Sequence, residues 1–226
     1  MNTPTTTRYP MPFCRIELAV FARDGEQLKL LAAQRDSAPE RGRWALPGGV
    51  IRLDLDGDLA AAARRVAQER TGQALPGLQP LCAVGGRGRD TRGAVGGWAL
   101  SVVYRVLLGA LPAVLPGKRV QALRWVEVDE LDTLAPWAFD HRQLAADALA
   151  ATRQDVAELR FAAGYLPERF TLTQLQQACE IVLSQPLEKS NFRRKLRERD
   201  VVQALAGEYQ TGPFRPAAVY RLRRSG

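Results

Sequence analysis

The chain has 226 residues, of which 46% are hydrophobic and 25% charged, a composition typical of globular proteins. This length suits one large domain or two small ones. The longest apolar runs fall well short of a membrane span, and the first dozen residues lack the charged-then-apolar pattern of a signal peptide. We therefore expect a cytoplasmic protein with no membrane partner.

The cysteine and histidine contents limit the redox and metal chemistry. Cys14, Cys82 and Cys179 are odd in number, widely spaced and free of any Cys-x-x-Cys pair. This pattern predicts reduced core residues, neither disulfides nor zinc ligands. A metal centre built on histidines is excluded, because the chain has a single histidine.

The net charge of +8 is concentrated near the C-terminus. Residues 190–226 hold nine lysines and arginines against three acidic residues. A clustered basic segment is typical of a nucleic-acid-binding module. A solvated basic tail has the same composition, so charge alone leaves both interpretations open.

The first half of the chain alternates β-rich runs with turn signals. Phe13–Phe21 and Gln27–Gln34 are separated by an Asp-Gly turn and predict a hairpin. Short strands follow on either side of Pro47-Gly48-Gly49. Asp58 then predicts the N-cap of an alanine-rich helix that ends at Gly72, because glycine suits a helix C-cap.

Further strands are predicted at Leu81–Val84, Trp98–Leu108 and Val120–Val126. Between the first two lies Gly85–Gly93, which we expect to be a mobile loop rich in glycine and arginine. A long helix is predicted from about residue 140 to 162, bridging to a second unit. This order of elements indicates an α+β fold of the αβα sandwich kind.

After a break at Gly164–Pro167, the remaining elements differ in plan. Helices are predicted from Phe170-Thr171 to Leu183 and from Ser190 to about Arg199. Two strands follow, at Val201–Leu205 and Ala217–Leu222. A helix, a short turn, a basic helix and a hairpin indicate a winged helix-turn-helix. We therefore divide the chain into residues 1–163 and residues 164–226.

The helix that ends at Gly72 carries a damaged copy of the Nudix box. In that motif an early glutamate precedes the helical pattern Arg-Glu-apolar-any-Glu-Glu-any-Gly, whose carboxylates hold Mg²⁺. Arg65 and Glu69 fit the pattern, but Val66, Arg70 and Gly57 stand where glutamates are expected. Magnesium needs several hard oxygen ligands, so we expect no metal site, no cofactor and no catalytic residues.

Four short segments elsewhere in the chain are distinctive, namely Phe139-Asp140-His141, Phe170-Thr171-Leu172, Asn191–Leu196 and Arg215–Tyr220. With the damaged motif, they resemble the NrtR family, Nudix-related transcriptional regulators of NAD metabolism. The resemblance covers nearly the whole chain after the first dozen residues. It implies a Nudix domain that senses ADP-ribose or a related nucleotide. It also implies a homodimer whose winged helices bind a palindromic operator and repress genes of NAD synthesis or salvage.

Candidate DNA contacts lie mainly at the start of the second helix of the winged unit, whose N-terminal residues reach base edges in this architecture. Thr171 can equally serve as a helix cap, and Phe192 and Leu196 are expected to be core. The arginines near the C-terminus are candidates for phosphate contact. The predicted DNA-binding residues are Thr171, Thr173, Gln174, Ser190, Asn191, Arg193, Arg194, Lys195, Arg197, Arg215 and Arg221.

Candidate ligand contacts lie in the Nudix unit. Arg70 stands where metal normally sits and can neutralise a diphosphate, or it can point elsewhere. Arg65 can bind phosphate or pair with Glu69, four residues along the helix. The predicted ligand-binding residues are Gly48, Gly49, Arg65, Glu69, Arg70, Arg87, Arg89 and Arg92.

Two rival functions remain open. The chain can be a working Nudix hydrolase of ADP-ribose or another nucleoside diphosphate derivative, if Glu69, Asp56 and Asp58 rebuild a metal site. It can also be an RNA-binding protein, although its basic segment lacks the interleaved aromatics that single-strand binding favours.

Overall fold

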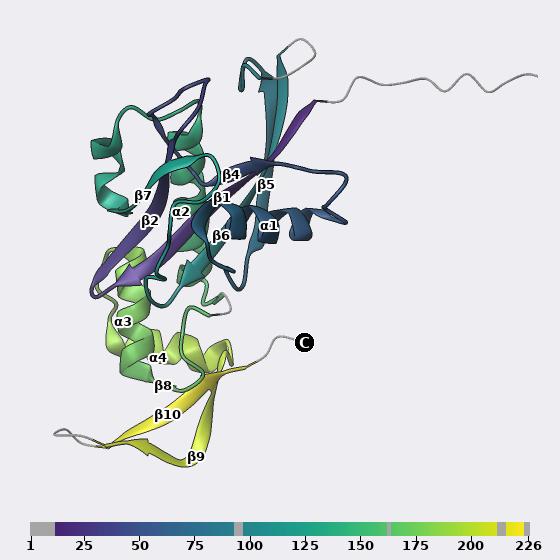
Figure 1. Cartoon of the computed structure of the whole chain (residues 1–226). Helices are drawn as coiled ribbons and strands as arrows, with labels where there is room; N and C mark the ends of the chain where they lie inside the picture. The colour runs from purple at the N-terminus through teal and green to yellow at the C-terminus, as the bar shows by residue number, and fades with distance from the viewer. Residues whose placement is uncertain (1–11, 93–96, 162–163, 212–215, 224–226) are drawn as a thin grey trace, which may run out of the picture.

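The computed structural model describes residues 12–92, 97–161, 164–211 and 216–223. These residues form a seven-stranded sheet with flanking helices, followed by a smaller three-stranded sheet with two helices. Figure 1 shows the smaller part below the larger one, with its helices nearest the large sheet and its hairpin farthest away.

The large sheet is built around two long parallel strands, β1 (Phe13–Asp24) and β6 (Trp98–Leu108). Strand β2 (Gln27–Arg35) continues from β1 through the predicted hairpin. All remaining described pairings in this sheet are antiparallel, with β3 and β7 on β2, β4 on β1, and β5 on β6. These strands are β3 (Trp44–Ala45), β4 (Gly48–Val50), β5 (Gln79–Arg87) and β7 (Val120–Glu127).

Helices cover both faces of this sheet. Alternating side chains of β1 point to opposite faces, so Leu18 and Val20 pack under α1 (Leu59–Thr71). Ala19 and Phe21 point the other way and share a core with α2 (His141–Ala157). Burial on both faces explains why β1 is continuously apolar, and it confirms the predicted αβα sandwich.

The caps of α1 are those that the sequence predicts. The Asp58 carboxylate accepts a hydrogen bond from the backbone N of Ala61 at 2.6 Å. At the other end Gly72 adopts φ 69°, the left-handed conformation that glycine tolerates without steric cost.

The predicted mobile loop is partly wrong. Strand β5 continues to Arg87, which pairs with Trp98 on β6. Gly85 belongs to this strand because a Cβ there would lie 2.7 Å from the Trp98 ring, so glycine makes room for a large aromatic. The backbone pairing of this hairpin extends beyond Arg87, because Gly88 N donates to Gly97 O at 3.0 Å. Of the glycines in this hairpin, Gly85 serves close packing, whereas a Cβ on Gly86 or Gly88 would meet nothing within 4 Å.

Two other predicted boundaries also shift. Helix α2 ends at Ala157, earlier than predicted, and Leu159 then takes φ 60°, with its side chain buried. Strand β9 (Val202–Gln210) continues past Leu205, where the predicted strand ends, and runs through Gly207. Gly207 has φ 78°, and the pairing of β9 with β10 (Ala217–Leu222) shifts register between Ala218 and Tyr220, so the strand absorbs a bulge.

The second unit is a winged helix, as predicted. Its sheet has the order β8-β10-β9, where β8 is Phe170–Thr171. Helices α3 (Leu172–Leu183) and α4 (Lys189–Glu198) pack beside it. One buried apolar cluster contains Phe170, Leu175 and Leu196 together with Leu149 and Val156 of α2. Because this core is continuous across the two units, the division at residue 163 stays a prediction.

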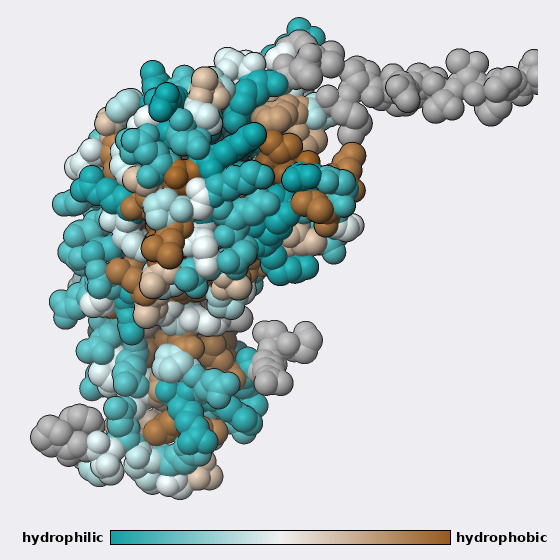
Figure 2. Space-filling model, viewed as in Figure 1, coloured by the Kyte–Doolittle hydropathy of each residue, from teal (hydrophilic) through white to brown (hydrophobic). Residues whose placement is uncertain are grey.

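Figure 2 shows a largely hydrophilic face with scattered apolar patches over both units. Of the three cysteines, all free, Cys179 is buried as predicted, whereas Cys82 is exposed on edge strand β5, which contradicts its assignment to the core. Within the part of the chain that the structure describes, no helix is long and apolar enough to cross a membrane.

Candidate functional site

The motif arginine of the damaged box is held by carboxylates. Arg65 donates from Nε and Nη2 to the two Asp56 carboxylate oxygens at 2.7 Å each, and from Nη1 to Glu69 at 3.2 Å. Its Nη2 also donates to Val50 O at 2.8 Å. The predicted pair with Glu69 is therefore present, and a second pair with the nearly buried Asp56 joins it. This network braces the loop before α1 against the helix.

The residues present do not fit the magnesium that Nudix hydrolases use. Glu69 is the box carboxylate that remains, and it is engaged by Arg65. Asp56 is paired with the same arginine, and Asp58 caps the helix. Across residues 12–92, 97–161, 164–211 and 216–223, no three His, Cys, Asp or Glu side chains gather in a way that could hold a metal ion. The acids that could rebuild a metal site therefore have other partners.

Arg70 is buried, with 8% of its surface exposed. Its Nε donates to Gly48 O at 2.7 Å, and its Nη1 donates to Lys118 O. The loop that carries Lys118 also closes the C-terminal end of α1, since Lys118 N donates to Glu69 O at 2.8 Å. Burial lowers the pKa of Arg70, but a guanidinium stays protonated in proteins. A fixed positive charge thus stands where the box would have a carboxylate.

Arg70 lines a small cavity beside the Gly48 strand. Every ionisable side chain among the described residues that line it is an arginine. Burial, and then the charges of Arg92 and Arg15, lower the pKa of Arg35. Mutual repulsion of this kind favours an anionic ligand. The five arginines are Arg15, Arg35, Arg70, Arg92 and Arg119.

Aromatic rings fix two of these arginines. The guanidinium of Arg35 lies 5.1 Å from the ring centre of Phe139, and that of Arg92 lies 5.4 Å from the same ring. Arg92 also lies 5.3 Å from the Phe13 ring and pairs with Asp90. Cation–π contacts with both side chains, and the Asp90 carboxylate on Arg92, therefore hold these two arginines in place.

A buried polar network centred on Glu17 lies next to the cavity and includes Arg15, which lines it. Glu17 is 1% exposed and accepts from Arg15 Nε at 2.7 Å. Burial is the largest single influence and acts to raise the pKa of Glu17, but the charges of Arg15, His141 and Arg89 and the hydrogen bond from Arg15 together hold that pKa below its usual range. A Cβ on Gly48 would lie 1.7 Å from Glu17 Oε2, so this close approach requires glycine. One on Gly49 would lie 2.8 Å from Val66.

Asp140 and His141, from the Phe139-Asp140-His141 segment, make structural contacts around this network. His141 Nδ1 accepts the backbone N–H of Leu46 at 3.0 Å, so its ring proton is on Nε2, which lies 3.9 Å from Glu17. Burial lowers the pKa of His141. Asp140 accepts from Arg89 at 2.6 and 3.1 Å, and Arg89 also donates to Ser101. The segment therefore ties α2 to the cavity wall.

The predicted ligand-binding residues fall into two groups. Gly48, Arg70 and Arg92 line the cavity, and Gly49 follows in the same strand. The others lie outside its lining, and Arg89 is held by Asp140, so it is not the mobile group that was expected. Those outside the lining are Arg65, Glu69, Arg87 and Arg89.

The sequence does not single out Arg15, Arg35 or Arg119. Arg15 lies on β1, Arg35 is the last residue of β2, and Arg119 immediately precedes β7. Arg119 is therefore far from the other two in the chain. None belongs to a motif, and they meet because β1, β2 and β7 are neighbours in the sheet. An arginine amid apolar strand residues, such as Arg15, is the one signal that could have found this site.

The second candidate site is the exposed face of α4. Phe192 and Leu196 are buried, as predicted, and this orients the helix. Glu188 caps it by accepting from the backbone N of Ser190 at 2.8 Å and of Asn191 at 2.6 Å. The predicted DNA-binding side chains of this helix are all exposed, namely Ser190, Asn191, Arg193, Arg194, Lys195 and Arg197.

Within this face Arg194 has partners of its own. Its Nη2 donates to Asn191 Oδ1 and its Nη1 to Glu198 Oε1, both at 2.8 Å. In α3, Thr171 and Gln174 form a reciprocal capping box, with Thr171 N donating to Gln174 at 2.8 Å. Thr171 thus serves as the helix cap that was considered for it, and Thr173 beside it is exposed.

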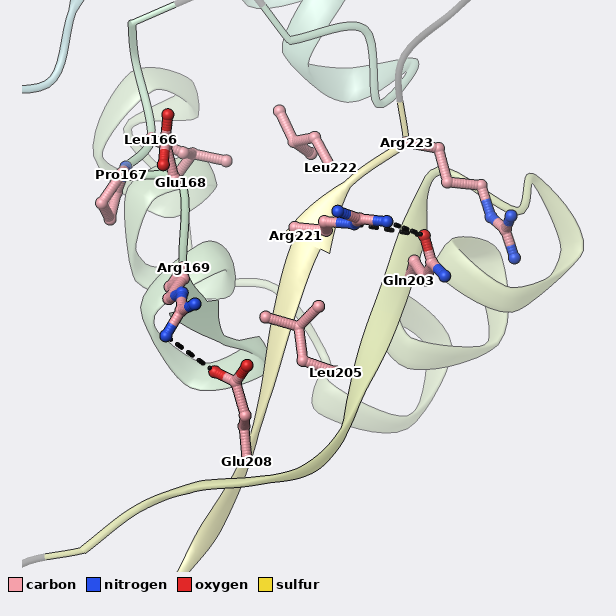
Figure 3. Close-up of a pocket in the computed structure, with 10 residues that line it drawn as sticks. All are labelled: Leu166, Pro167, Glu168, Arg169, Gln203, Leu205, Glu208, Arg221, Leu222 and Arg223. Atoms are coloured by element: carbon pink, nitrogen blue, oxygen red, sulfur yellow. Dashed lines mark hydrogen bonds and ion pairs between the residues drawn. The ribbon is translucent and has the colours of Figure 1, made fainter.

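The wing supplies a third feature. A groove runs between residues 166–169 and the open face of the β9–β10 hairpin (Figure 3). Arg221 points across the hairpin and donates to Gln203 at 3.0 and 3.2 Å, while Arg169 pairs with Glu208 at 3.1 Å. Arg215, predicted to contact DNA, lies outside the described residues.

Known proteins share both units. The Nudix domain family matches residues 15–148, and the NrtR DNA-binding winged helix domain matches residues 162–222. The chain is similar to the ADPR responsive transcriptional repressor NtrR of Acinetobacter baylyi, with 34% identity covering 95% of this chain and 83% of the relative.

Solved structures of NrtR proteins are also similar to this chain. Shewanella oneidensis NrtR complexed with a 27mer DNA has a TM-score of 0.72 and 29% identity, covering 93% of each chain. The Nudix domain of the same protein complexed with ADP ribose has a TM-score of 0.58 and 30% identity, covering 67% of this chain and 94% of that one. With both domain matches and this similarity over almost its whole length, the chain belongs to the NrtR family.

Proposed function

We propose that this protein is a transcriptional repressor that binds operator DNA through its winged helix and ADP-ribose through its Nudix domain. The cavity lined by five arginines supports the ligand most directly, because clustered guanidinium groups suit a diphosphate. The structure of a relative with ADP ribose and that of a relative with DNA support the two binding roles.

The DNA-binding half rests on α4. Its exposed basic side chains follow a helix whose buried face is fixed by Phe192 and Leu196. Arginine suits bidentate contact with guanine, and asparagine suits adenine. The protein would act as a homodimer on a palindromic operator, because two-fold symmetric winged helices present two such helices at a fixed spacing.

Ligand sensing requires two conformers. ADP-ribose must bind better to the conformer in which the paired α4 helices are wrongly spaced for the operator, since a ligand with equal affinity for both would shift nothing. The regulated genes are proposed to be those of NAD synthesis or salvage, the role that the family resemblance implies. Such a repressor works where the DNA is, so the cytoplasmic location belongs to the same proposal.

Hydrolysis is not part of this function. Arg70 occupies the place of a metal-binding glutamate, and Glu69 is held by Arg65. The A. baylyi relative is described as a repressor. We therefore propose that the Nudix domain binds its ligand with its arginines and leaves it intact.

The direct test measures binding of the purified full chain to the DNA upstream of its own gene. Fluorescence anisotropy at stated salt, with and without saturating ADP-ribose, should show sequence-specific binding that ADP-ribose changes. AMP and ribose 5-phosphate are the matched controls. Specific binding that ignores ADP-ribose would refute the sensing role. Mg²⁺-dependent release of AMP without specific DNA binding would instead favour a hydrolase.

A further inference from the structure

Helix α2 is in contact with both candidate sites. At its start, Asp140 holds Arg89 and His141 accepts from Leu46, and Leu46 itself lines the arginine cavity. Its 17 residues span about 25 Å at the usual rise of an α-helix. Its last turns reach the winged helix, where Val156 shares the apolar cluster with residues of α3. A rigid helix therefore joins the wall of the ligand cavity to the DNA-binding unit.

Arg153, near the end of α2, forms hydrogen bonds to the turn between α3 and α4. Its Nε donates to Val182 O at 3.0 Å, and its Nη2 donates to Ser184 Oγ at 2.8 Å. Ser184 is the C-cap of α3 and adopts the left-handed conformation, with φ 52°. The last carbonyls of a helix have no partner within it, so a guanidinium from α2 satisfies one of them.

The same guanidinium also faces the sensor. Nη2 of Arg153 lies 3.4 Å from Asp129 Oδ1, and Asp129 belongs to the 3₁₀ segment η1 (Val128–Leu134), which follows β7. Arg153 thus links three segments at one point: α2, η1 and the end of α3. Apolar packing between α2 and α3 is non-directional and permits sliding, whereas these hydrogen bonds fix one relative position.

The location of this link determines what it can control. The turn that Arg153 holds leads within a few residues to Glu188, the N-cap of α4. The direction of α4, and hence of its exposed basic side chains, follows from that turn. Shifts of about 1–2 Å between packed helices are a usual form of allosteric change.

We propose that Arg153 is the positioning residue through which the state of the arginine cavity sets the placement of α4 on DNA. The inference rests on the proposed function, because it assumes that ADP-ribose changes operator affinity. Ligand binding alters the contacts that Leu46 and Arg89 make with the start of α2, at His141 and Asp140. Helix α2 is thereby displaced, and Arg153 transmits this displacement to the end of α3.

The test uses Arg153→Met in the full chain, which keeps much of the aliphatic stem and removes the guanidinium. Arg142→Met is the matched control, since Arg142 lies on the same helix but pairs with the exposed Asp132 within the sensor. The DNA is a duplex that the wild-type protein selects from a random pool. Anisotropy gives its dissociation constant with and without saturating ADP-ribose, and calorimetry gives ADP-ribose affinity without DNA.

In Arg153→Met we expect the ADP-ribose-dependent change in DNA affinity to shrink at least about fivefold relative to wild type, within the usual range of allosteric coupling. ADP-ribose affinity without DNA should change less than about twofold, and the Arg142→Met control should keep the wild-type coupling. A merely structural role would weaken DNA binding equally with and without ligand and leave their ratio intact. That result, in a folded variant, would overturn the proposal.

Ser184→Gly provides a second variant that folds readily, because glycine suits the left-handed C-cap. It removes the Oγ acceptor while leaving the bond to Val182 O, so we expect a partial loss of coupling. Unchanged coupling in both variants would overturn the inference alone. Absence of any ADP-ribose effect in the wild-type protein would refute the proposed sensing function and this inference with it.

Discussion

Arginine is used in two opposite ways in this molecule. In the sensor, Arg70 and Arg89 are mostly buried and each is held by oxygen atoms of the protein. On α4, Arg193 and Arg197 are exposed. The buried arginines lose hydration on folding and must be satisfied by neighbours, which fixes their geometry. The exposed ones keep their hydration and their freedom.

This difference separates two kinds of anion recognition. In the proposed function, the cavity binds its ligand through guanidinium groups that protein neighbours largely hold already, which reduces the ordering cost of binding. A flexible basic surface attracts a polyanion through counterion release, and its binding depends strongly on salt. Substitutions of the buried arginines should therefore change both stability and ligand binding, whereas substitutions of the exposed arginines on α4 should change DNA binding alone.

The largest effect is expected from Gly48→Ala. The new Cβ would lie 1.7 Å from the buried Glu17 Oε2, so β4 or Glu17 must move. We expect a loss of about 3 kcal/mol or more in the free energy of unfolding, measured by urea denaturation. Gly57→Ala is the control, because nothing lies within 4 Å of its Cβ position. Equal stability of the two variants would show that β4 is not pressed against Glu17.

Arg70→Met tests whether a buried arginine contributes to stability and to ligand binding at once. It leaves Gly48 O and Lys118 O without their donor, which should cost about 2–4 kcal/mol of stability. The ADP-ribose affinity of the variant, measured by calorimetry, should be lower than that of the wild-type protein. The wild-type affinity itself should be the same in Mg²⁺ and in EDTA. Arg64→Met, on the exposed side of the same helix, is the control. Wild-type binding that requires Mg²⁺ would contradict the arginine-based site.

Arg193→Ala sharpens the other side of the comparison. DNA affinity should fall by about 1–3 kcal/mol, while urea denaturation should show almost no change, because the side chain is exposed. Arg64→Ala removes the same charge from the sensor surface and should leave DNA affinity nearly intact. Similar losses in both variants would mean that net charge, not the α4 face, governs binding. Anisotropy at two salt concentrations separates the cases.

The smallest effect concerns pH. Burial holds the pKa of His141 below its ordinary value of 6.5, so the unfolded chain binds a proton more readily than the folded one. The stability contribution is complete above about pH 6.5 and is lost as the pH falls from there toward the folded pKa. The slope is at most about 1.4 kcal/mol per pH unit.

The chain has one histidine, which makes this prediction easy to check. In His141→Asn the side-chain oxygen can still accept the Leu46 N–H, but no group titrates there. Urea denaturation between pH 7.5 and 5.5 should show a slope in the wild-type protein and a much flatter profile in the variant. Parallel profiles would place the titrating group elsewhere.

Much of the fold is readable from local sequence. Asp58 and Gly72 bound α1 because side-chain capping and left-handed backbone are properties of single residues. The helix starting after Thr171 and the burial of Phe192 and Leu196 follow from local spacing in the same way. These signals involve residues close in the chain, so a linear pattern carries them.

The ends of β5, α2 and β9 depended on partners elsewhere. Strand β5 reaches Arg87 because Trp98 on β6 packs over Gly85, which no local pattern reveals. Helix α2 stops early because Leu159 turns into the core at positive φ. Tertiary packing overrides local propensity at such places.

The sequence by itself determined the two-domain plan, the damaged metal motif and the basic helix, since each is a local pattern of residue types. Only the tertiary structure decided which arginines form the cavity. Arg15, Arg35 and Arg119 meet Arg70 across neighbouring strands. Sheet pairing joins residues distant in the chain, and burial then decides which charges keep protein partners and which remain exposed.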